Sequence, residues 1–397
     1  MNRRRGIIRL KAYFRAAPEG DHMLRLERVE PSAALWADRA AYPDRLIFHT
    51  EQWLRFVAES QRAEPVLARV MDGGTSVGHF TGLLVKRYGL RILGSPMAGW
   101  TTSYVGFNLD PAIPRRAALA ALMPFAFREL GCAHLEIRDR GLVEADLEGL
   151  GLRWAAAPTA VIDLTPGEDA LFGAMASACR RNIRKAAKSA VVIEEVTDDP
   201  EFADEFYDQL RDVFAKQNLV PTYSIERARS LIRNLAPEGP GFSAPSVGPG
   251  AGRDTAPEGP GFSAPSVGPG AGSGTAQLLL LRARDGEGRC IATAVLPWYH
   301  RTMYFWGGAS YRQHQQLRPN EALIWHALRW AKSRGVTEFD FVGGNSYKAK
   351  YGTTEVPVPW ARRSRSPLVA GLRDAAKEGF ALKQRAVARL SRVRSAS

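Results

Sequence analysis

Two stretches share one layout: LMPFAFRELGCAHLEIRD at Leu122–Asp139 and IWHALRWAKSRGVTEFDFVG at Ile324–Gly343. In each, an apolar segment of about three helical turns stops at a glycine, Gly131 or Gly335, and a short apolar run follows. Glycine suits the left-handed backbone position that follows a helix end. The two stretches therefore predict a helix that leads into a buried strand, once in each half of the chain.

Three strand patterns precede each of these helices. In the first half they occupy 65–71, 77–85 and 91–95, and in the second half 278–283, 290–299 and 302–307. A turn follows the first strand of each series, Asp-Gly-Gly in one half and Asp-Gly-Glu-Gly in the other. We predict an α+β (mixed α/β) fold with two related lobes, each a twisted mixed sheet with flanking helices. A chance recurrence of common patterns is the alternative.

The length of 397 residues exceeds what one ordinary hydrophobic core organises, which also favours two lobes. We divide the chain into a basic N-terminal segment (1–25), a first lobe (26–158), a second lobe (159–360) and a basic C-terminal tail (361–397). A tandem repeat, APEGPGFSAPSVGPGAG followed by RDT or SGT, interrupts the second lobe at 236–275. Its Pro and Gly content predicts a disordered loop, and we assign it no chemistry.

The composition is that of a soluble globular protein, with 45% hydrophobic and 24% charged residues. The N-terminal stretch lacks the apolar run of a secretory signal, and no window has the length and apolarity of a membrane span. Cys132, Cys179 and Cys290 lie far apart without metal-ligand spacing. We expect a cytoplasmic protein with no metal site and no disulfide framework.

A series of short motifs marks the second half. In order they are ACRRNIRKA from Ala178, FAKQNLVPTYS from Phe214, WGGAS from Trp306, LRPNEALIW from Leu317, and FDFVGG with YKAKYG from Phe339. This series resembles the FemAB-like and BioF2-like branch of the GNAT acyltransferase superfamily, over roughly 45–352. The resemblance implies twin GNAT-like lobes and direct transfer of an acyl or aminoacyl group to a primary amine of a cell-envelope precursor.

The donor site departs from the usual GNAT pattern. Acetyl-CoA-dependent members carry a glycine-rich turn whose amides bind the pyrophosphate at a helix N-terminus. Here that place reads Leu317-Arg318-Pro319-Asn320-Glu321, where Pro319 lacks an amide proton and no glycine permits close approach. An ordinary CoA site is disfavoured. We expect no permanently bound cofactor, and the donor stays open between aminoacyl-tRNA, a carrier-bound acyl group and an acyl-CoA that is held differently.

Two residues are our catalytic candidates. Lys348 matches the lysine of the family's C-terminal motif, where a fixed cation stabilises a substrate phosphate or an oxyanion, although a solvated surface lysine is the alternative. Asp340 lies between two aromatic residues, where a carboxylate is costly unless it is paired. It is a candidate base or orienting group for the amine, or a hydrogen-bonding group that fixes the following Gly343-Gly344 turn.

The substrate-binding candidates carry cationic or aromatic side chains. Guanidinium groups match phosphate oxygens in pairs, and aromatic side chains line channels, although solvated helix faces and core packing are the respective alternatives. The candidates are Arg180, Arg181, Arg184, Lys216, Tyr223, Tyr304, Trp306, Lys350, Trp100 and Tyr104.

The last 37 residues carry ten Arg or Lys against Asp374 and Glu378, with leucines and alanines at near-helical spacing. We favour docking on the anionic inner face of the cytoplasmic membrane, with a frayed soluble helix or a grip on tRNA phosphates as alternatives. The expected partner is a lipid-linked or nucleotide-linked sugar peptide. The sequence leaves the oligomeric state open.

Two other functions compete with aminoacyl or acyl transfer to a peptidoglycan or envelope-polysaccharide precursor. One is a CoA-dependent N-acetyltransferase that modifies a sugar amine in exopolysaccharide synthesis. The other is a non-catalytic, membrane-associated adaptor derived from a transferase. No nucleophile elbow or histidine pairing favours a hydrolase.

Overall fold

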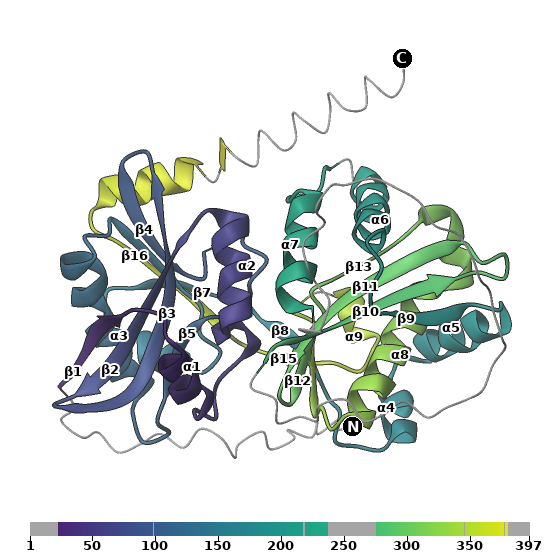
Figure 1. Cartoon of the computed structure of the whole chain (residues 1–397), viewed down its shortest axis with the longest axis horizontal. Helices are drawn as coiled ribbons and strands as arrows, with labels where there is room; N and C mark the ends of the chain where they lie inside the picture. Colours follow the sequence, from purple (N-terminus) through teal and green to yellow (C-terminus); the bar gives the residue numbers. More distant parts are fainter. Residues whose placement is uncertain are drawn as a thin grey trace, which may run out of the picture.

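Two halves lie side by side in the computed structural model, each built on one eight-stranded sheet (Figure 1). The structure describes residues 23–97, 99–216, 219–236, 275–344, 346–376 and 378–379. The first 22 residues, most of the tandem-repeat insertion (237–274) and the tail beyond 379 lie outside the described residues. The expectations of a disordered insertion and of a helical distal tail concern these parts.

The first sheet has the strand order β1-β2-β3-β4-β6-β16-β7, and β5 pairs with β3. Its strands are β1 (Leu24–Val29), β2 (Glu64–Asp72), β3 (Thr75–Arg87), β4 (Leu90–Ser95), β5 (Gly106–Leu109), β6 (His134–Ile137), β7 (Arg153–Ala156) and β16 (Pro359–Ser364). The helical segments of this half are α1 (Ala33–Ala40), η1 (Ile47–His49), α2 (Glu51–Gln61), α3 (Arg115–Pro124), η2 (Phe125–Glu129) and η3 (Glu144–Leu147).

The second sheet has the order β15-β8-β14-β12-β11-β10-β9, and β13 pairs with β11. Its strands are β8 (Thr159–Asp163), β9 (Val192–Val196), β10 (Gln277–Arg284), β11 (Cys290–Tyr299), β12 (Thr302–Tyr304), β13 (Gly307–Ser310), β14 (Glu338–Asp340) and β15 (Thr354–Val356). Its helices are α4 (Glu168–Ala174), α5 (Ser177–Lys188), α6 (Phe202–Lys216), α7 (Ile225–Leu235), η4 (Arg312–Leu317), α8 (Pro319–Ser333) and α9 (Ser346–Ala349).

The two sheets have the same topology. An antiparallel series, β1-β2-β3-β4 or β9-β10-β11-β12, continues into a parallel strand, β6 or β14. The helix that precedes this parallel strand ends before a left-handed glycine in both halves, Gly131 (φ 64°) and Gly335 (φ 76°). The prediction of two related mixed α/β lobes is confirmed.

The lobes exchange the strands that lie beside their parallel strands. In the second sheet β8, which directly follows the first lobe along the chain, pairs antiparallel with β14. In the first sheet the corresponding place beside β6 belongs to β16, which comes after the whole second lobe. The lobe boundary that we drew at residue 360 therefore falls inside a strand of the first sheet. The described start of the tail, residues 367–376, is helical.

One hydrophobic core crosses the seam between the lobes. It contains Phe48 and Trp53 of the first lobe together with Phe206 and Tyr304 of the second. Thr50 accepts a hydrogen bond from the Trp53 backbone and begins α2, whose apolar face enters this core. Helices α2 and α7 face each other across the seam (Figure 1). The shared core fixes how the second lobe's central strands lie against the first lobe.

Candidate functional site

Strands β12 and β14 separate at Asp340. They pair in parallel only from Thr302 with Glu338 to Tyr304 with Asp340, and the last link is a 2.8 Å hydrogen bond from the Phe305 amide to the Asp340 carbonyl. Beyond this point β13 stays paired with β11, whereas the other chain turns away after Asp340. The two parallel strands therefore separate in the middle of the second sheet, and Asp340 is the residue at the point of separation.

The Asp340 carboxylate is completely buried, and its two oxygens have different surroundings. Oδ1 accepts hydrogen bonds from the Thr159 hydroxyl (2.6 Å) and the Val342 amide (2.7 Å). Thr159 in turn accepts one from the Gly343 amide (3.0 Å). Oδ1 therefore fixes the turn after β14, as one of our two interpretations expected. Oδ2 accepts no hydrogen bond from any described residue.

Arg140 supplies the positive charge beside Asp340. Its guanidinium donates to both oxygens of Glu338, at 2.6 and 2.8 Å, and Nη1 lies 3.5 Å from Asp340 Oδ2. Burial opposes its charge, but Glu338 and Asp340 outweigh burial and raise the pKa of Arg140. Both terminal nitrogens of Arg140 donate to Glu338, and Arg140 forms an ion pair with Asp340 Oδ2 without a hydrogen bond to it.

Tyr104 and Tyr304 close the site from the two lobes. Both are buried, and each packs edge-on against Phe48. Burial raises the pKa of both phenols, and the charge of Asp340 adds to this effect, so both remain protonated. The Tyr104 hydroxyl lies near Thr159 but meets no partner at hydrogen-bonding geometry within the described part of the chain. We predicted these tyrosines as substrate contacts, and the structure brings both to Asp340.

Lys348 holds the loop that follows β14. Its Nζ donates hydrogen bonds to the carbonyls of Phe341 and Gly343, each at 2.8 Å. Burial lowers the pKa of Lys348, while Asp340 acts in the opposite direction. Both catalytic candidates from the sequence therefore meet at the same turn.

Lys350 points elsewhere, to the first turn of α8. Its Nζ lies 2.7 Å from Glu321 Oε1, which also accepts a hydrogen bond from Asn182 of α5 (3.1 Å). This is the helix end at which the resemblance would place a pyrophosphate, and here Pro319 is its first residue and a buried carboxylate lies in its first turn. Because Lys350 is paired with Glu321, its charge is not available to a pyrophosphate at this helix end. The residues present do not fit an ordinary CoA pyrophosphate cradle.

A second group of aromatic candidates lies on the seam. The centre of the Trp306 ring lies 5.5 Å from that of Tyr223 and 6.3 Å from that of Phe56 in α2. The Trp306 Nε1 donates a hydrogen bond to the Thr101 carbonyl (3.1 Å). Trp100 is partly buried against the same core. These side chains join the two lobes through packing.

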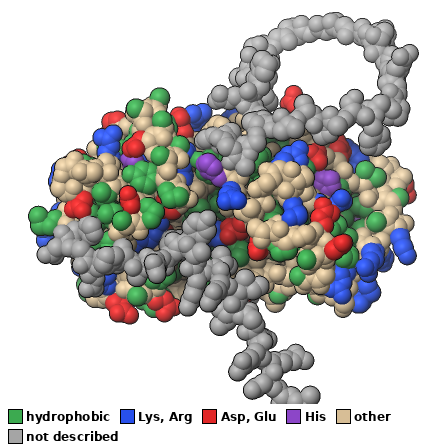
Figure 2. All heavy atoms as spheres, turned by 90° about the horizontal axis from the view of Figure 1, so that it is seen from below, with side chains coloured by type: hydrophobic (Ala, Val, Ile, Leu, Met, Phe, Trp, Pro, Cys, Tyr) green, Lys and Arg blue, Asp and Glu red, His purple; other side chains and the backbone are tan. Residues whose placement is uncertain are grey.

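The arginine candidates on α5 are not at the Asp340 site. Arg180 donates to the carbonyls of Gly173 and Met175, which closes the end of α4, and Arg184 stacks over Phe172 at 5.1 Å. Arg181 is exposed. Lys and Arg side chains gather at the end of the second lobe where α5 lies (Figure 2). Lys216 ends α6, and its side chain lies outside the described residues.

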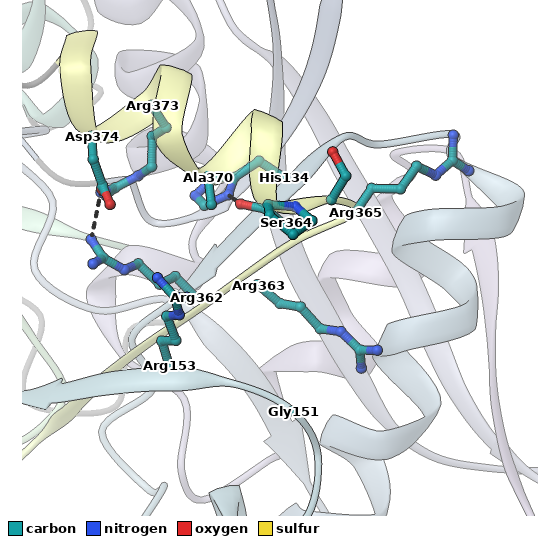
Figure 3. A pocket seen from close by; sticks show the side chains of 12 residues that line it. His134, Gly151, Arg153, Arg362, Arg363, Ser364, Arg365, Ala370, Arg373 and Asp374 are labelled. Atoms are coloured by element: carbon teal, nitrogen blue, oxygen red, sulfur yellow. Dashed lines mark hydrogen bonds and ion pairs between the residues drawn. The ribbon is translucent and has the colours of Figure 1, made fainter.

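A pocket of about 200 Å³ lies on the first lobe, between β16, β7 and the helical residues 367–376 (Figure 3). Arg153 and Arg362 are opposite each other on the two strands. Nη1 of Arg362 lies 3.6 Å from Oδ1 of Asp374 in the helix. Arg373 forms an ion pair with the buried Glu136 of β6. The sequence analysis named none of these as pocket residues, and only the arginine density of the tail hinted at them.

Comparisons with known proteins agree with this geometry. The family model described as "Acetyltransferase (GNAT) domain" matches residues 254–351. The solved structure of FemX has a TM-score of 0.61 at 14% identity, and the match covers 84% of this chain and 96% of FemX. A tandem GNAT protein from the clavulanic acid biosynthesis pathway has a TM-score of 0.50 at 12% identity, covering 87% of this chain and 99% of that one. No curated protein matches the sequence.

The family model identifies a GNAT acetyltransferase domain at residues 254–351, and the chain shares the two-lobed GNAT fold of the similar solved structures. Its arrangement is similar to that of FemX, with two GNAT-like lobes in one chain. A GNAT domain implies an acyl-CoA donor in general. In the described part of the chain, no helix has the length and apolarity needed to cross a bilayer.

Sequence reasoning missed Arg140 and Thr159. Both are separated from Asp340 by about half the chain. Arg140 reaches it from the first lobe, and Thr159 reaches it because β8 pairs with β14 in the second sheet. The available signal was the position of Arg140 just after the first lobe's parallel strand, which corresponds to the place after β14 in the second lobe.

Proposed function

We propose that this chain transfers an acyl or aminoacyl group to a primary amine of a cell-envelope precursor, with Asp340 as the proton acceptor. The observation that carries the proposal is the buried Asp340 Oδ2, which lies at the split between β12 and β14 and accepts no hydrogen bond from the described residues. A carboxylate oxygen in this state is able to take a proton from an attacking amine. Because Asp340 is completely buried, we infer that the seam opens to admit the amine.

The reaction proceeds directly between the two substrates. The amine nitrogen attacks the carbonyl carbon of the donor ester and loses a proton to Asp340 Oδ2. The tetrahedral intermediate collapses, the ester oxygen leaves, and Asp340 returns the proton to it, so no covalent enzyme intermediate forms. Arg140 and the Tyr104 hydroxyl lie near Asp340, where they would stabilise the oxyanion of a tetrahedral intermediate that forms beside it.

Aminoacyl-tRNA is the donor that we favour. Pro319 and the Glu321–Lys350 pair occupy the helix end that would otherwise bind the CoA pyrophosphate. A charged tRNA has no such requirement, because its ester lies at the end of a nucleic acid strand. Its phosphates would meet the basic surface over α5, where Arg181 and Arg184 are exposed.

The alternative is a CoA-dependent N-acetyltransferase that acts on a sugar amine, and the family description "Acetyltransferase" favours it. Isothermal titration calorimetry with acetyl-CoA separates the two. Our account predicts no stoichiometric binding to the purified chain, and total tRNA charged with labelled amino acids should instead bind and serve as donor. Tight one-to-one acetyl-CoA binding would establish the alternative.

The described part of the tail supports docking on an anionic membrane. Leu368 and Leu372 stand one turn apart on the helical residues 367–376, with 74% and 56% of their surfaces exposed. Arg153 and Arg362 lie in the adjacent pocket. Apolar side chains that enter the acyl boundary next to arginines are typical of a helix that lies in a membrane surface. Such docking would suit a lipid-linked acceptor.

A further inference from the structure

Two arginines are buried in the first lobe without the partners that buried arginines require. Arg39 lies in α1 and has 0% of its surface exposed, and Arg45 lies just before η1 with 8% exposed. Neither makes an ion pair among the described residues, although the Asp38 carboxylate lies near enough to Arg39 to affect its charge. Sequence analysis gave no role to either.

Arg39 uses only one of its nitrogens. Nη2 donates to the Thr81 hydroxyl and, at 3.4 Å, to the Asn108 side-chain oxygen, whereas Nε and Nη1 have no hydrogen-bond acceptor in the described structure. The guanidinium also lies over the Trp36 ring at 5.4 Å. Burial and the neighbouring charge of Arg45 lower the pKa of Arg39 to about 9.

Arg45 shows the same deficiency at the seam. Its guanidinium lies over the Tyr299 ring at the end of β11, 5.1 Å from the ring centre, and its Nε and Nη1 lack acceptors within the described residues. The Tyr299 hydroxyl, 2% exposed as a residue, is also unpartnered there. Burial lowers the pKa of Arg45. Arg45 and Tyr299 thus bring donors from both lobes to one place.

His49 adds one more donor to this group. The Leu46 amide donates to Nδ1 (3.1 Å), and the Asn108 side-chain nitrogen lies 3.0 Å from the same atom, so Nδ1 is the acceptor and Nε2 carries the proton. Nε2 lies near the Val105 carbonyl but not at hydrogen-bonding geometry. Burial, together with the charges of Arg39 and Arg45, lowers the pKa of His49, which keeps the ring neutral.

A buried charge without a partner strongly destabilises a fold, and proteins normally supply one. This chain does so at Arg282, which is equally buried and contacts Asp199 and Glu205 at 2.6 Å each and Glu194 at 3.4 Å. Within the described residues, no carboxylate takes this role for the Arg39–Arg45 pair. We propose that Arg39, Arg45, His49 and Tyr299 form a binding site for a phosphate group.

The donor set selects phosphate over other anions. Two guanidinium groups match a dianion in charge, and their paired N–H groups match its oxygens in geometry. A monocarboxylate would neutralise one arginine only. The phosphate group has two sources, the free ion or a phosphate ester of a larger ligand, and both present the same oxygens. Phosphate binding here is independent of the transfer reaction.

The test is a thermal denaturation titration of the full chain with inorganic phosphate, against chloride at matched ionic strength. The expected result is a saturable rise in Tm of about 2–4 °C. Arg45→Met and Arg39→Met should each abolish this rise. Each should also have a higher Tm than the wild type in phosphate-free buffer, because an uncompensated buried charge is removed. A parallel titration with a nucleoside diphosphate distinguishes the sources. If the diphosphate binds at least tenfold more tightly than inorganic phosphate, the site belongs to a phosphate ester. If its affinity falls below this threshold, the site belongs to the free ion.

Two control variants keep the result specific. Arg282→Met should lower the Tm in both buffers and retain the phosphate response. The exposed Arg211→Gln should change neither the Tm nor the rise in Tm with phosphate. The proposal is overturned if neither phosphate nor the diphosphate stabilises the wild type, or if Arg45→Met and Arg39→Met respond to phosphate as the wild type does.

Discussion

The two oxygens of the Asp340 carboxylate differ in their hydrogen bonds within the described residues. Oδ1 holds Thr159 and the Val342 amide, which fixes the turn, while Oδ2 faces Arg140 at 3.5 Å. The sequence leaves a base and a hydrogen-bonding group as alternatives for Asp340, and the structure shows hydrogen bonds to Oδ1. The base role is the part that remains a proposal.

Lys348 allows a direct test of whether the loop after β14 must be held for transfer. Lys348→Met removes the donor to the Phe341 and Gly343 carbonyls and should lower the free energy of unfolding by about 1–3 kcal/mol. Transfer should fall at least about tenfold, because the turn beside Asp340 loosens. Lys332 is the matched control, since its Nζ also donates to two carbonyls, those of Leu164 and Thr165, far along the chain from the turn. Lys332→Met should lose stability but keep transfer, and equal losses of transfer in both variants would contradict this role.

A buried histidine predicts acid sensitivity of the first lobe. Burial and the charge of Arg39 lower the pKa of His79 from 6.5 to about 4, against the opposing effect of Asp38. Between pH 6.5 and 4 the unfolded chain therefore binds a proton that the folded chain does not, so the free energy of unfolding falls as the pH falls, by up to about 1.4 kcal/mol per pH unit. His79→Gln should reduce this slope in urea denaturation measured across that range. An identical slope in the variant would show that His79 does not carry the effect.

At the scale of elements, the order of strands and helices followed from the sequence because each lobe repeats a local pattern. The strands 65–71, 77–85 and 91–95 correspond to β2, β3 and β4, and Gly131 and Gly335 take the left-handed positions expected of them. Pairing between distant segments did not follow, because alternating patterns set which face of a strand is buried but not its neighbour in the sheet. The return of β16 to the first sheet is such a pairing.

The exchange of β8 and β16 predicts where truncation is tolerated. A chain that stops after residue 358 loses β16, which lies between β6 and β7, and we expect it to be insoluble or to lose its cooperative unfolding transition. A chain that stops after residue 379 keeps β16 and Arg373, the ion-pair partner of buried Glu136, and should unfold within about 2 °C of the full chain. Circular dichroism melting compares the two. A stable, soluble chain that ends at residue 358 would show that the exchange is dispensable.

The sequence predicted the part of the candidate site that lies within one motif and not the part that depends on contacts between distant segments. Asp340 and Lys348 lie within one motif, so the sequence placed them together, whereas Arg140 and Tyr104 reach them only through the packing of the two lobes. Arg180 and Arg184 matched the family pattern, but in the structure they close α4 and stack on Phe172. A charge pattern on a helix indicates that a cationic face exists and does not indicate what that face meets.

For the whole molecule, membrane docking by the start of the tail is a measurable property. Replacing Leu368 and Leu372 together by Glu should reduce binding to vesicles that contain anionic phospholipid by at least about tenfold, because two exposed apolar side chains are lost and two negative charges are added. Vesicle co-sedimentation at low and high salt measures the effect. Neutral vesicles should bind the wild type weakly at either salt concentration. Equal binding of the variant and the wild type to anionic vesicles would place the contact elsewhere.

The account as a whole is tested most directly by mass spectrometry of envelope precursors from cells that lack the chain and are complemented with the wild type, Asp340→Asn or Asp163→Asn. Asp163 is an exposed carboxylate on β8 and serves as the control. We predict that the wild type and Asp163→Asn add a defined acyl or aminoacyl mass to an amine-bearing precursor, and that Asp340→Asn, folded by circular dichroism, reduces this product at least about 100-fold. The same precursor masses with and without the wild-type chain, or full product from Asp340→Asn, would contradict acyl transfer at this site.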